Sequence, residues 1–405
     1  MRRHSTIFVS VGVLVVAIAL GLTASRKSLP EIEHDAYIWQ RSWKTSLLES
    51  ISGNKDLVRA WRVLAAHAGP AGNLIPVSIH AKALVESGRA LVMVVRIDGQ
   101  LPNLDQSHII DEVLALRERW RAQGLTVAGL EIDHDCGTAK LPGYAKFLTQ
   151  LRTRLDRSTQ LSITALPAWL SSNHLADVLG AIDESVLQVH SVSHPGSGLF
   201  DPEQAKKWIA EYAKKSPTTF RVALPTYGSR VGFDDFGSVA FVESEAAAGR
   251  GGANSHELVV TPESVRQLMI AVGGQRPANF RGYAWFRLPT EADKRAWSIS
   301  TWRGLIVGKP QTQAARITAK PNKDPRLFDL VAENHSETDV LQPLGVKLAS
   351  HCSDADGVNG YEPRQIDGIF WLVRKAPSLL RPKHEINLGW ARCEQNPELL
   401  VHEKS

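Results

Sequence analysis

Residues 127–136 read Val-Ala-Gly-Leu-Glu-Ile-Asp-His-Asp-Cys, a largely apolar run that carries three regularly spaced carboxylates. A short apolar run of this kind is typical of a buried β-strand. Side chains two residues apart on a strand share a face, so Glu131, Asp133 and Asp135 point one way and the apolar residues between them point the other. Because the apolar face needs covering helices, we expect the carboxylates to face the interior or the mouth of a barrel.

Seven further β-rich runs lie on either side of this one, with amphipathic helical stretches between them. The eight expected strands are Ala36–Trp39, Arg62–Ala66, Leu91–Ile97, Val127–Asp133, Leu161–Leu166, Val186–His190, Phe220–Pro225 and Gly282–Phe286. Helices are expected at Ile109–Gln123, Tyr144–Leu155, Pro202–Lys214 and Pro262–Val272. No GxGxxG motif follows the first strand, which argues against a doubly wound sheet. The alternation predicts an α/β fold, a (β/α)8 TIM barrel over residues 33–306.

The pattern changes after the barrel. Residues 307–325 read as a linker, and apolar and polar residues alternate beyond it without long helical periods. Strands are expected there at Phe328–Ala332, Gly345–Ala349, Ile369–Val373 and Ile386–Ala391. This predicts a small β-sandwich-like domain over residues 326–400.

Residues 1–25 carry the features of an export signal. Arg2 and Arg3 precede an apolar run over residues 7–22, and small residues follow it. The run is shorter than the ~20 residues of a comfortable membrane span, so a cleaved signal peptide and a retained inner-membrane anchor both stay open. The positive-inside rule places everything after residue 25 across the membrane. We therefore expect a periplasmic or secreted protein, tethered through residues 7–22 in the anchored case.

Composition excludes several classes of protein. A hydrophobic fraction of 43% and a charged fraction of 22% over 405 residues are typical of a folded chain and exclude disorder or coiled coil as a general description. The formal charge is +5, and no basic run with interleaved aromatic residues occurs, so nucleic acid is not an expected partner. No CxxC spacing occurs among the three cysteines, so structural zinc is not expected. Cys352 and Cys393 can pair in an oxidising compartment, which would leave Cys136 single.

The three carboxylates of the 127–136 strand form an electrostatically costly arrangement. They repel one another at spacings of ~7 Å, and burial penalises their charged forms, so at least one pKa should be raised unless basic partners intervene. A raised carboxyl pKa suits a general acid. The structural alternative is that Asp133 and Asp135 cap the following loop while Glu131 pairs with an inward arginine such as Arg96. His134 points away from the carboxylates, so shared coordination of a metal is not expected, nor is any cofactor.

The same strand resembles a known motif. Residues 129–135, Gly-Leu-Glu-Ile-Asp-His-Asp, resemble the DGxDxDxE strand of the chitinase-like glycoside hydrolases of family 18. Residues 96–99, Arg-Ile-Asp-Gly, stand where that superfamily has Ser-x-Gly-Gly, and residues 224–228, Leu-Pro-Thr-Tyr-Gly, resemble its Pro-x-Tyr-Gly element. Trp285 matches the aromatic residue that floors the sugar site. The resemblance covers about residues 35–305.

The whole chain is more similar still to a bacterial family of unknown function, domain of unknown function 3142. The similarity includes residues 37–43, Tyr-Ile-Trp-Gln-Arg-Ser-Trp, residues 166–169, Leu-Pro-Ala-Trp, and residues 188–192, Gln-Val-His-Ser-Val. That family name carries no assigned activity, so the likeness to glycosidase barrels supplies the mechanism.

By position, the glycosidase resemblance implies that Asp135 is the catalytic acid, that Asp133 orients the substrate N-acetyl group, and that Glu131 is the deeper acid. Aspartate in place of glutamate draws the proton donor back by ~1.5 Å, and productive geometry tolerates little displacement. Residues 188–191, Gln-Val-His-Ser, replace the family's Met-x-Tyr-Asp, so the tyrosine that helps the acetamide attack is missing. A true chitinase is therefore not expected.

Further residues at strand ends are expected to bind the substrate. Aromatic faces stack on sugar rings, arginines neutralise carboxylates or grip an acidic sugar, and a histidine orients a carboxylate. The predicted substrate-binding residues are Tyr37, Trp39, Arg96, Asp98, Trp169, His190, Tyr227, Trp285 and Arg287. For each aromatic residue taken singly, packing in the barrel core is an equally good interpretation.

Two functions follow for an exported barrel whose ligand is a polysaccharide or glycoconjugate. The first is glycoside hydrolysis, with Asp135 as the acid and Asp133 as its partner. The second is a non-catalytic role in saccharide binding or cell-envelope assembly. Geometry separates them: hydrolysis requires both carboxylates to line an open cleft with an aromatic floor. An arginine such as Arg96 or Arg287 that pairs with the carboxylates would favour binding or a structural role.

Overall fold

The structure is a computed structural model. It describes residues 31–69, 72–99, 106–190, 198–234, 238–243, 255–309, 314–349 and 351–402. The predicted signal or anchor, residues 1–25, lies outside this set. Within the described part of the chain, each helix is too short or too polar to cross a membrane.

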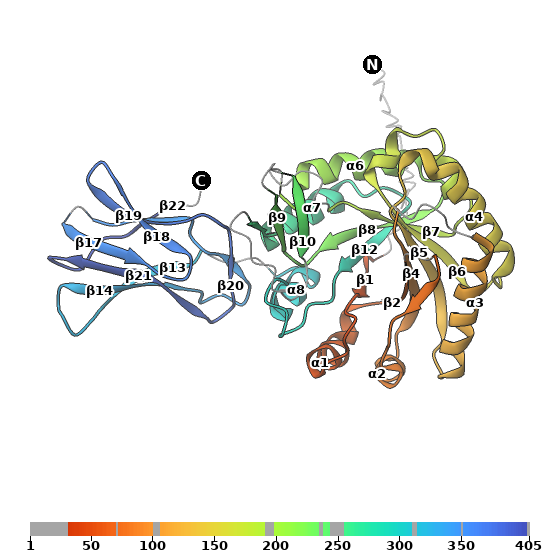
Figure 1. The fold of residues 1–405 in the computed structure, drawn as a ribbon, viewed down its shortest axis with the longest axis horizontal. Coiled ribbons are helices and arrows are strands. Elements are labelled where there is room, and N and C mark those ends of the chain that lie inside the picture. The colour runs from red at the N-terminus through yellow and green to blue at the C-terminus, as the bar shows by residue number, and fades with distance from the viewer. Residues whose placement is uncertain are drawn as a thin grey trace, which may run out of the picture. The chain divides into compact units, whose positions relative to one another are not determined.

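Eight parallel strands close into a barrel (Figure 1). They are β1 (Glu33–Ile38), β2 (Ala60–Ala68), β4 (Ala90–Ile97), β5 (Val127–His134), β6 (Gln160–Ala165), β7 (Glu184–Gln188), β8 (Thr219–Pro225) and β12 (Phe280–Phe286). They pair in this order, and β12 pairs with β1 to close the ring. β3 (Leu74–Pro76) adds an antiparallel edge to β2. Each predicted run overlaps one barrel strand, so the predicted TIM barrel is confirmed.

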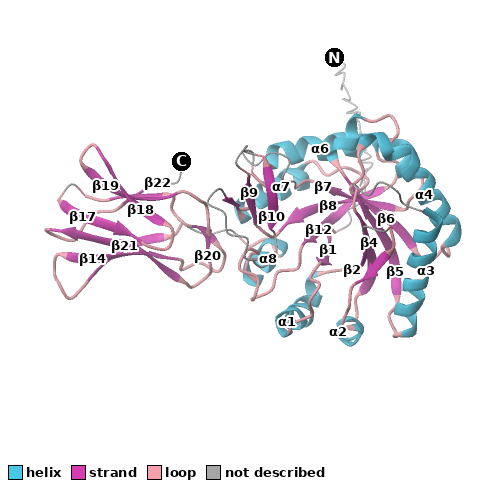
Figure 2. Cartoon of the chain, viewed as in Figure 1, coloured by secondary structure: helices cyan, strands magenta, loops and turns pink. Residues whose placement is uncertain are grey.

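Helices cover the outside of the barrel (Figure 2). They are α1 (Thr45–Asn54), α2 (Ala81–Ser87), α3 (Gln106–Ala122), α4 (Leu141–Arg154), α5 (Leu175–Leu179), α6 (Pro202–Lys215), α7 (Pro262–Gly274) and α8 (Ile299–Ile306), with 3-10 turns at Lys55–Leu57, Thr138–Lys140 and Pro167–Ser171. Local sequence explains several starts. The Asp201 carboxylate accepts the N–H groups of Glu203 and Gln204, and the Thr261 hydroxyl accepts that of Ser264. In both helices the N-cap precedes a proline in the first turn, which favours helix initiation.

An excursion separates β8 from α7. Strands β9 (Ser229–Phe233), β10 (Val239–Glu243) and β11 (Ser255–Leu258) form a small antiparallel sheet in the order β10-β9-β11. Because the loops that follow barrel strands border the barrel mouth, this sheet belongs to the end of the barrel where a site is expected.

The C-terminal part is built from strands (Figure 2). They are β13 (Arg316–Pro321), β14 (Leu327–Glu333), β15 (Val340–Leu341), β16 (Gly345–Lys347), β17 (Cys352–Gly357), β18 (Tyr361–Ile366), β19 (Ile369–Arg374), β20 (Leu379–Leu380), β21 (Glu385–Cys393) and β22 (Leu400–His402). Two antiparallel sheets run β13-β14-β21-β17 and β18-β19-β16-β22. They enclose a separate apolar core that includes Leu330, Val346 and Leu372. All four predicted strands occur here, and β13 lies inside the predicted linker, residues 307–325.

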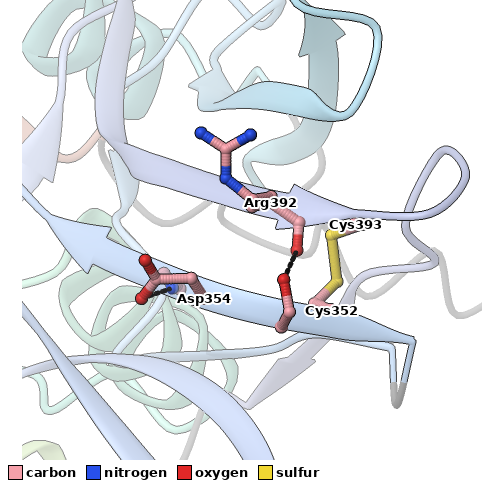
Figure 3. The surroundings of a disulfide bond; sticks show 6 residues. Cys352, Asp354, Arg392 and Cys393 are labelled. Atoms are coloured by element: carbon pink, nitrogen blue, oxygen red, sulfur yellow. Dashed lines mark hydrogen bonds between the residues drawn. A yellow bond between two sulfur atoms is a disulfide. The ribbon is translucent and has the colours of Figure 1, made fainter.

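A disulfide joins two strands of this β domain (Figure 3). Cys352 on β17 lies directly opposite Cys393 on β21, and the two sulfurs are bonded. Beside it, the Ser353 hydroxyl donates to the carbonyl oxygen of Arg392 at 3.4 Å. Cys136 is buried in the barrel part as a free thiol. The pairing left open by the sequence is therefore present in the fold.

Candidate functional site

The barrel interior below the mouth is filled by charged side chains. Arg62 on β2 donates to Asp35 on β1 at 3.0 Å and to Glu184 on β7 at 2.6 Å, and it also bonds Glu131 on β5. Arg221 on β8 contacts Asp35 at 3.2 Å and Glu184 at 3.1 Å. We call these five residues the central network. Each carboxylate in it contacts a guanidinium, which offsets the cost of burying the negative charge.

Glu131 belongs to this network and not to the open end of the barrel. Its side chain is fully buried, and it accepts hydrogen bonds from the Tyr37 hydroxyl at 2.7 Å and the Ser162 hydroxyl at 3.3 Å. Burial, together with the neighbouring negative charge of Glu131, raises the pKa of Tyr37 well above its usual value. The structural alternative predicted that Glu131 forms an ion pair with an inward arginine such as Arg96. The arginine that pairs with Glu131 is Arg62. Tyr37 accordingly lies beneath the mouth, where it connects the network to the aromatic residues above.

Asp133 and Asp135 lie one and two steps further along the same face, and both are held by Arg96. This arginine lies on the neighbouring strand β4. Its Nη1 donates a hydrogen bond to the Asp133 carboxylate and its Nη2 donates one to the Asp135 carboxylate, each at 2.7 Å. Strand register explains the contact, because Arg96 lies directly opposite Asp133 in the β4–β5 pair. The Arg96 and Asp135 side chains are 36% and 34% exposed, whereas that of Asp133 is 6% exposed. We call Arg96, Asp133 and Asp135 the mouth cluster.

Burial raises the pKa of Asp133 from its ordinary 3.8 to about 6; Arg96 opposes the rise and the charge of Asp135 adds to it. The folded state therefore holds a proton on Asp133 that the unfolded chain has lost between about pH 4 and pH 6, and stability falls as the pH rises through this window. Replacing Asp133 by asparagine removes this titration. The free energy of unfolding of the wild type should fall relative to Asp133→Asn by roughly 2 kcal/mol between pH 4 and pH 7.

Urea unfolding at several pH values measures this difference. Asp111→Asn is the matched control, since Asp111 is 62% exposed and pairs with Arg154 on the outer surface. Its difference from the wild type should stay flat across the same range. A flat difference for Asp133→Asn as well would show that Asp133 titrates as an ordinary surface carboxyl.

An aromatic cluster borders the mouth cluster. The Trp39 ring lies 6.0 Å from the Arg96 guanidinium carbon. The Phe286 ring lies 5.0 Å from that of Trp39 and 5.5 Å from each of the rings of Tyr37, His190 and Tyr227. Phe286, at the end of β12, is therefore the centre of this cluster. It was missed among the predicted site residues, although it ends the predicted eighth strand.

Trp285 and Trp169 lie elsewhere, which corrects their predicted placement at the mouth. Trp285 is fully buried on the outer side of β12, donates its ring N–H to His34 at 3.0 Å, and packs against Trp302 of α8. Trp169 is also fully buried, and its ring N–H donates to the carbonyl oxygen of Cys136 at 2.9 Å. Successive side chains of a strand point to opposite faces. Trp285 therefore packs in the core outside the barrel strands, and the next residue, Phe286, faces the mouth. Core packing is the better interpretation for both tryptophans.

The remaining predicted residues surround the mouth. His190 follows β7, and its ring Nδ1 lies 3.2 Å from the Tyr227 hydroxyl. Burial lowers the pKa of His190 to about 3 and raises that of Tyr227 to about 12, so both are neutral at pH 7. The Arg287 guanidinium lies 6.0 Å from the Tyr227 ring and pairs with Asp293. Asp98 is exposed just beyond the end of β4.

Two polar groups of this site have hydrogen-bonding capacity that the described residues do not fill. Buried Nε2 of His190 has no hydrogen-bond partner within the described residues. The Asp135 side chain is one-third exposed. No group of three or more histidine, cysteine or carboxylate side chains in the described part of the chain is placed to hold a metal ion.

Sequence families place the chain. The family model described as domain of unknown function (DUF3142) matches residues 87–291, half of the 405 residues. The chain belongs to this family. The DUF3142 match includes the mouth cluster, and it confirms the resemblance inferred from the sequence. A second model, domain of unknown function (DUF8456), matches residues 317–394 of the β domain. None of the curated proteins is significantly similar to the chain.

Solved structures of spore cortex-lytic enzymes and of a chitinase share the barrel of this DUF3142 protein. The spore cortex-lytic enzyme SleL of Bacillus cereus has a TM-score of 0.51 at 15% identity, covering 70% of this chain and 75% of that chain. SleL of Bacillus megaterium QM B1551 has a TM-score of 0.50 at 12% identity, covering 65% and 72%. A chitinase from Chromobacterium violaceum ATCC 12472 has a TM-score of 0.50 at 11% identity, covering 70% and 100%. At these identities the likeness shows a glycosidase-like fold.

Proposed function

We propose that this protein is an exported saccharide-binding protein built on a glycosidase-like barrel, in which the mouth cluster holds sugar hydroxyls without cleaving a glycosidic bond. The observation that carries the proposal is the single Arg96 guanidinium bonded to both Asp133 and Asp135. A catalytic acid must carry a proton in the ground state. Asp135, which occupies the position of that acid, instead accepts a hydrogen bond from the Arg96 guanidinium at 2.7 Å.

The surroundings of the cluster suit a sugar. Ionised carboxylates accept hydrogen bonds from hydroxyl groups, and the guanidinium donates to ring or hydroxyl oxygens. Trp39 is half-buried and stands beside Arg96, so its ring can stack on a sugar face. The solved relatives named above include chitinases and spore cortex-lytic enzymes, which supports a polysaccharide or glycoconjugate as the ligand class.

Export is part of the proposal. Residues 1–25 carry the basic start and the apolar run of a signal peptide or anchor. The disulfide between Cys352 and Cys393 supports an oxidising compartment, since such bonds are rare in the cytosol of mesophiles. We infer a periplasmic or secreted protein, tethered to the inner membrane where residues 7–22 are retained.

Glycoside hydrolysis is the second candidate, and the burial of Asp133 favours it. A carboxyl group with a pKa of about 6 lies in the range of a general acid. Because both carboxylates contact one guanidinium at 2.7 Å, their bonded oxygens lie within about 8 Å of each other, which is compatible with the carboxyl separation of retaining glycosidases and with the shorter separations of inverting ones. In this mechanism a bound sugar displaces Arg96 from the two carboxylates.

A binding and hydrolysis assay on a panel of soluble bacterial polysaccharide fragments tests the two candidates together. Calorimetry measures affinity, and release of reducing ends measures cleavage at pH 5 and pH 7. The wild type should bind at least one fragment and release none. Asp135→Asn and Arg96→Gln should each weaken binding by about tenfold or more, since hydrogen bonds to charged groups contribute ~1.5–3 kcal/mol.

Arg154→Gln is the matched control, because Arg154 forms its ion pair with Asp111 on the outer surface. Its affinity should equal that of the wild type. Reducing ends released by the wild type and lost in Asp135→Asn would establish the hydrolase instead. If Asp135→Asn and Arg96→Gln both bind the fragments as tightly as the wild type does, the ligand does not bind at the mouth cluster.

A further inference from the structure

A cavity of about 770 Å³ lies beside the barrel mouth. Its walls come from the segments after β1 and β12 on the barrel side and from the segment after β19 in the β domain. Seven basic side chains and two acidic ones line it. Its volume is in the range of small-molecule binding sites. We call it the cationic cavity.

Both carboxylates of the cavity are already paired with arginines that also line it. Asp293 pairs with Arg287, and Glu257 pairs with Arg295 at 3.2 Å. Within each pair the negative charge of the carboxylate is balanced by its arginine, so neither carboxylate is left to neutralise another basic residue of the cavity. The positive charge of the cavity therefore comes from its remaining basic residues.

Four of those residues contact no carboxylate among the described residues. Arg41, Lys44 and Lys294 are exposed and form no ion pair with any described residue. The Arg374 guanidinium donates to the backbone carbonyl oxygens of Ala376, at 2.7 Å, and Asn359, so its charge is not neutralised either. Uncompensated cations that share one concave surface create a positive potential, which favours an anion as occupant.

The two walls of the cavity are joined by buried hydrogen bonds. The Asp339 carboxylate, in the β domain, accepts the backbone N–H of Ser298 at 2.7 Å, and its own N–H donates to the Thr301 hydroxyl at 2.7 Å. Arg381 donates across the same junction to the carbonyl oxygen of Asp293 at 2.7 Å. These contacts hold the basic residues of the two walls around one space.

The cavity also adjoins the mouth. Arg287 lines the cavity and lies 6.0 Å from the ring of Tyr227, which belongs to the aromatic cluster. Gln40 lines it too, directly follows Trp39, and donates to the carbonyl oxygen of Leu288 at 2.9 Å. The cationic cavity therefore borders the aromatic cluster of the mouth.

We propose that the cationic cavity is a second site, which binds the negatively charged units of an anionic saccharide. Arginine and lysine recognise carboxylate and sulfate groups alike, so uronate units and sulfate esters share the required chemistry. The saccharide nature of the ligand rests on the proposed function, whereas its negative charge rests on the cavity alone.

Calorimetric titration with three oligomers of similar length tests the site: an oligogalacturonate, a sulfated dextran and an uncharged dextran. The variant Arg41→Gln/Lys294→Gln removes two exposed charges, so it should fold as the wild type does. We expect the wild type to prefer an anionic oligomer. We expect the double variant to bind that oligomer at least about tenfold more weakly than the wild type does. The preferred oligomer identifies carboxylate or sulfate as the recognised group.

Lys206→Gln/Lys207→Gln on α6 is the matched control, with two exposed lysines that form no ion pair with a described residue. Its affinity should stay within about twofold of the wild type. Equal losses in both double variants, or no preference for an anionic oligomer, would overturn the second site. Anionic binding that depends on the cavity but not on Arg96 would keep this site and refute the proposed function. Neutral binding that depends on Arg96, without the anionic preference, would do the reverse.

Discussion

Replacing Arg62 by methionine is expected to lower the free energy of unfolding by about 3–5 kcal/mol, the range for breaking a buried ion pair. The Arg62 side chain is completely buried and contacts three carboxylates, those of Asp35, Glu131 and Glu184. Without it, Asp35 and Glu184 share the guanidinium of Arg221, and Glu131 loses the arginine that it contacts among the described residues. Burial alone would raise the pKa of Asp35, and Arg221 and Arg62 together reverse this, so that its pKa lies below the usual value. Removing one arginine therefore exposes the full cost of burying these charges.

Urea unfolding of Arg62→Met beside Arg154→Met measures the effect. Arg154 pairs with Asp111 at 3.0 Å but is 52% exposed, so its replacement should cost less than about 1 kcal/mol. The loss in Arg62→Met should also shrink as the pH falls, because protonated carboxyls need no counter-charge. Similar losses in the two variants would mean that the central network contributes no more than a surface pair.

Removing the disulfide should have an effect of comparable size in the β domain. The bond closes a loop with a sequence separation of 41 residues. Loop-closure entropy predicts that the double variant Cys352→Ser/Cys393→Ser loses about 4 kcal/mol, because its unfolded chain gains conformational freedom. Scanning calorimetry is the suitable measurement, since the barrel and the β domain have separate apolar cores and can give separate transitions.

Dithiothreitol supplies the internal control. It should lower the β-domain transition of the wild type towards that of the double variant, and it should leave the double variant unchanged. Cys136 is a buried free thiol in the barrel part, so the barrel transition should not respond to reductant. A wild-type β-domain transition that is insensitive to reductant would contradict a stabilising disulfide.

The strand β5 divides its three carboxylates between two tasks. Glu131 is held by Arg62, Tyr37 and Ser162 inside the barrel, where it serves stability. Asp133 and Asp135 stand closer to the opening and are held by Arg96, which is partly exposed and can exchange its partners for a ligand. The same two-residue repeat therefore yields a buried ionic layer and, one step further along, a candidate binding site.

Local patterns were sufficient for the architecture. The alternation of β-rich runs and helical stretches identified all eight barrel strands, and capping residues such as Asp201 and Thr261 marked helix starts. The two-residue repeat also placed Glu131, Asp133 and Asp135 on one face of their strand, because side-chain direction in a strand depends only on local backbone geometry.

The partners of those carboxylates were decided by the closed barrel. Strand register places Arg96 on β4 opposite Asp133 on β5, whereas Arg62 on β2, a strand that does not pair with β5, contacts Glu131 in the barrel interior. The pairing of β12 with its two neighbours in the barrel likewise depends on contacts between segments far apart in the sequence. An irregularity between Phe280 and Gly282 interrupts its pairing with β8, and a side chain at Gly282 would collide with the backbone of β1.

Sequence by itself therefore determined which segments form strands and helices, and which residues of one strand share a face. Tertiary structure alone decided that Phe286, and not Trp285, faces the mouth. It also decided that Arg96 is hydrogen-bonded to both Asp133 and Asp135. The physical reason is that secondary structure follows from interactions between near neighbours in the chain. The inward face of a closing strand and the choice of an ion-pair partner depend on register between segments far apart in sequence.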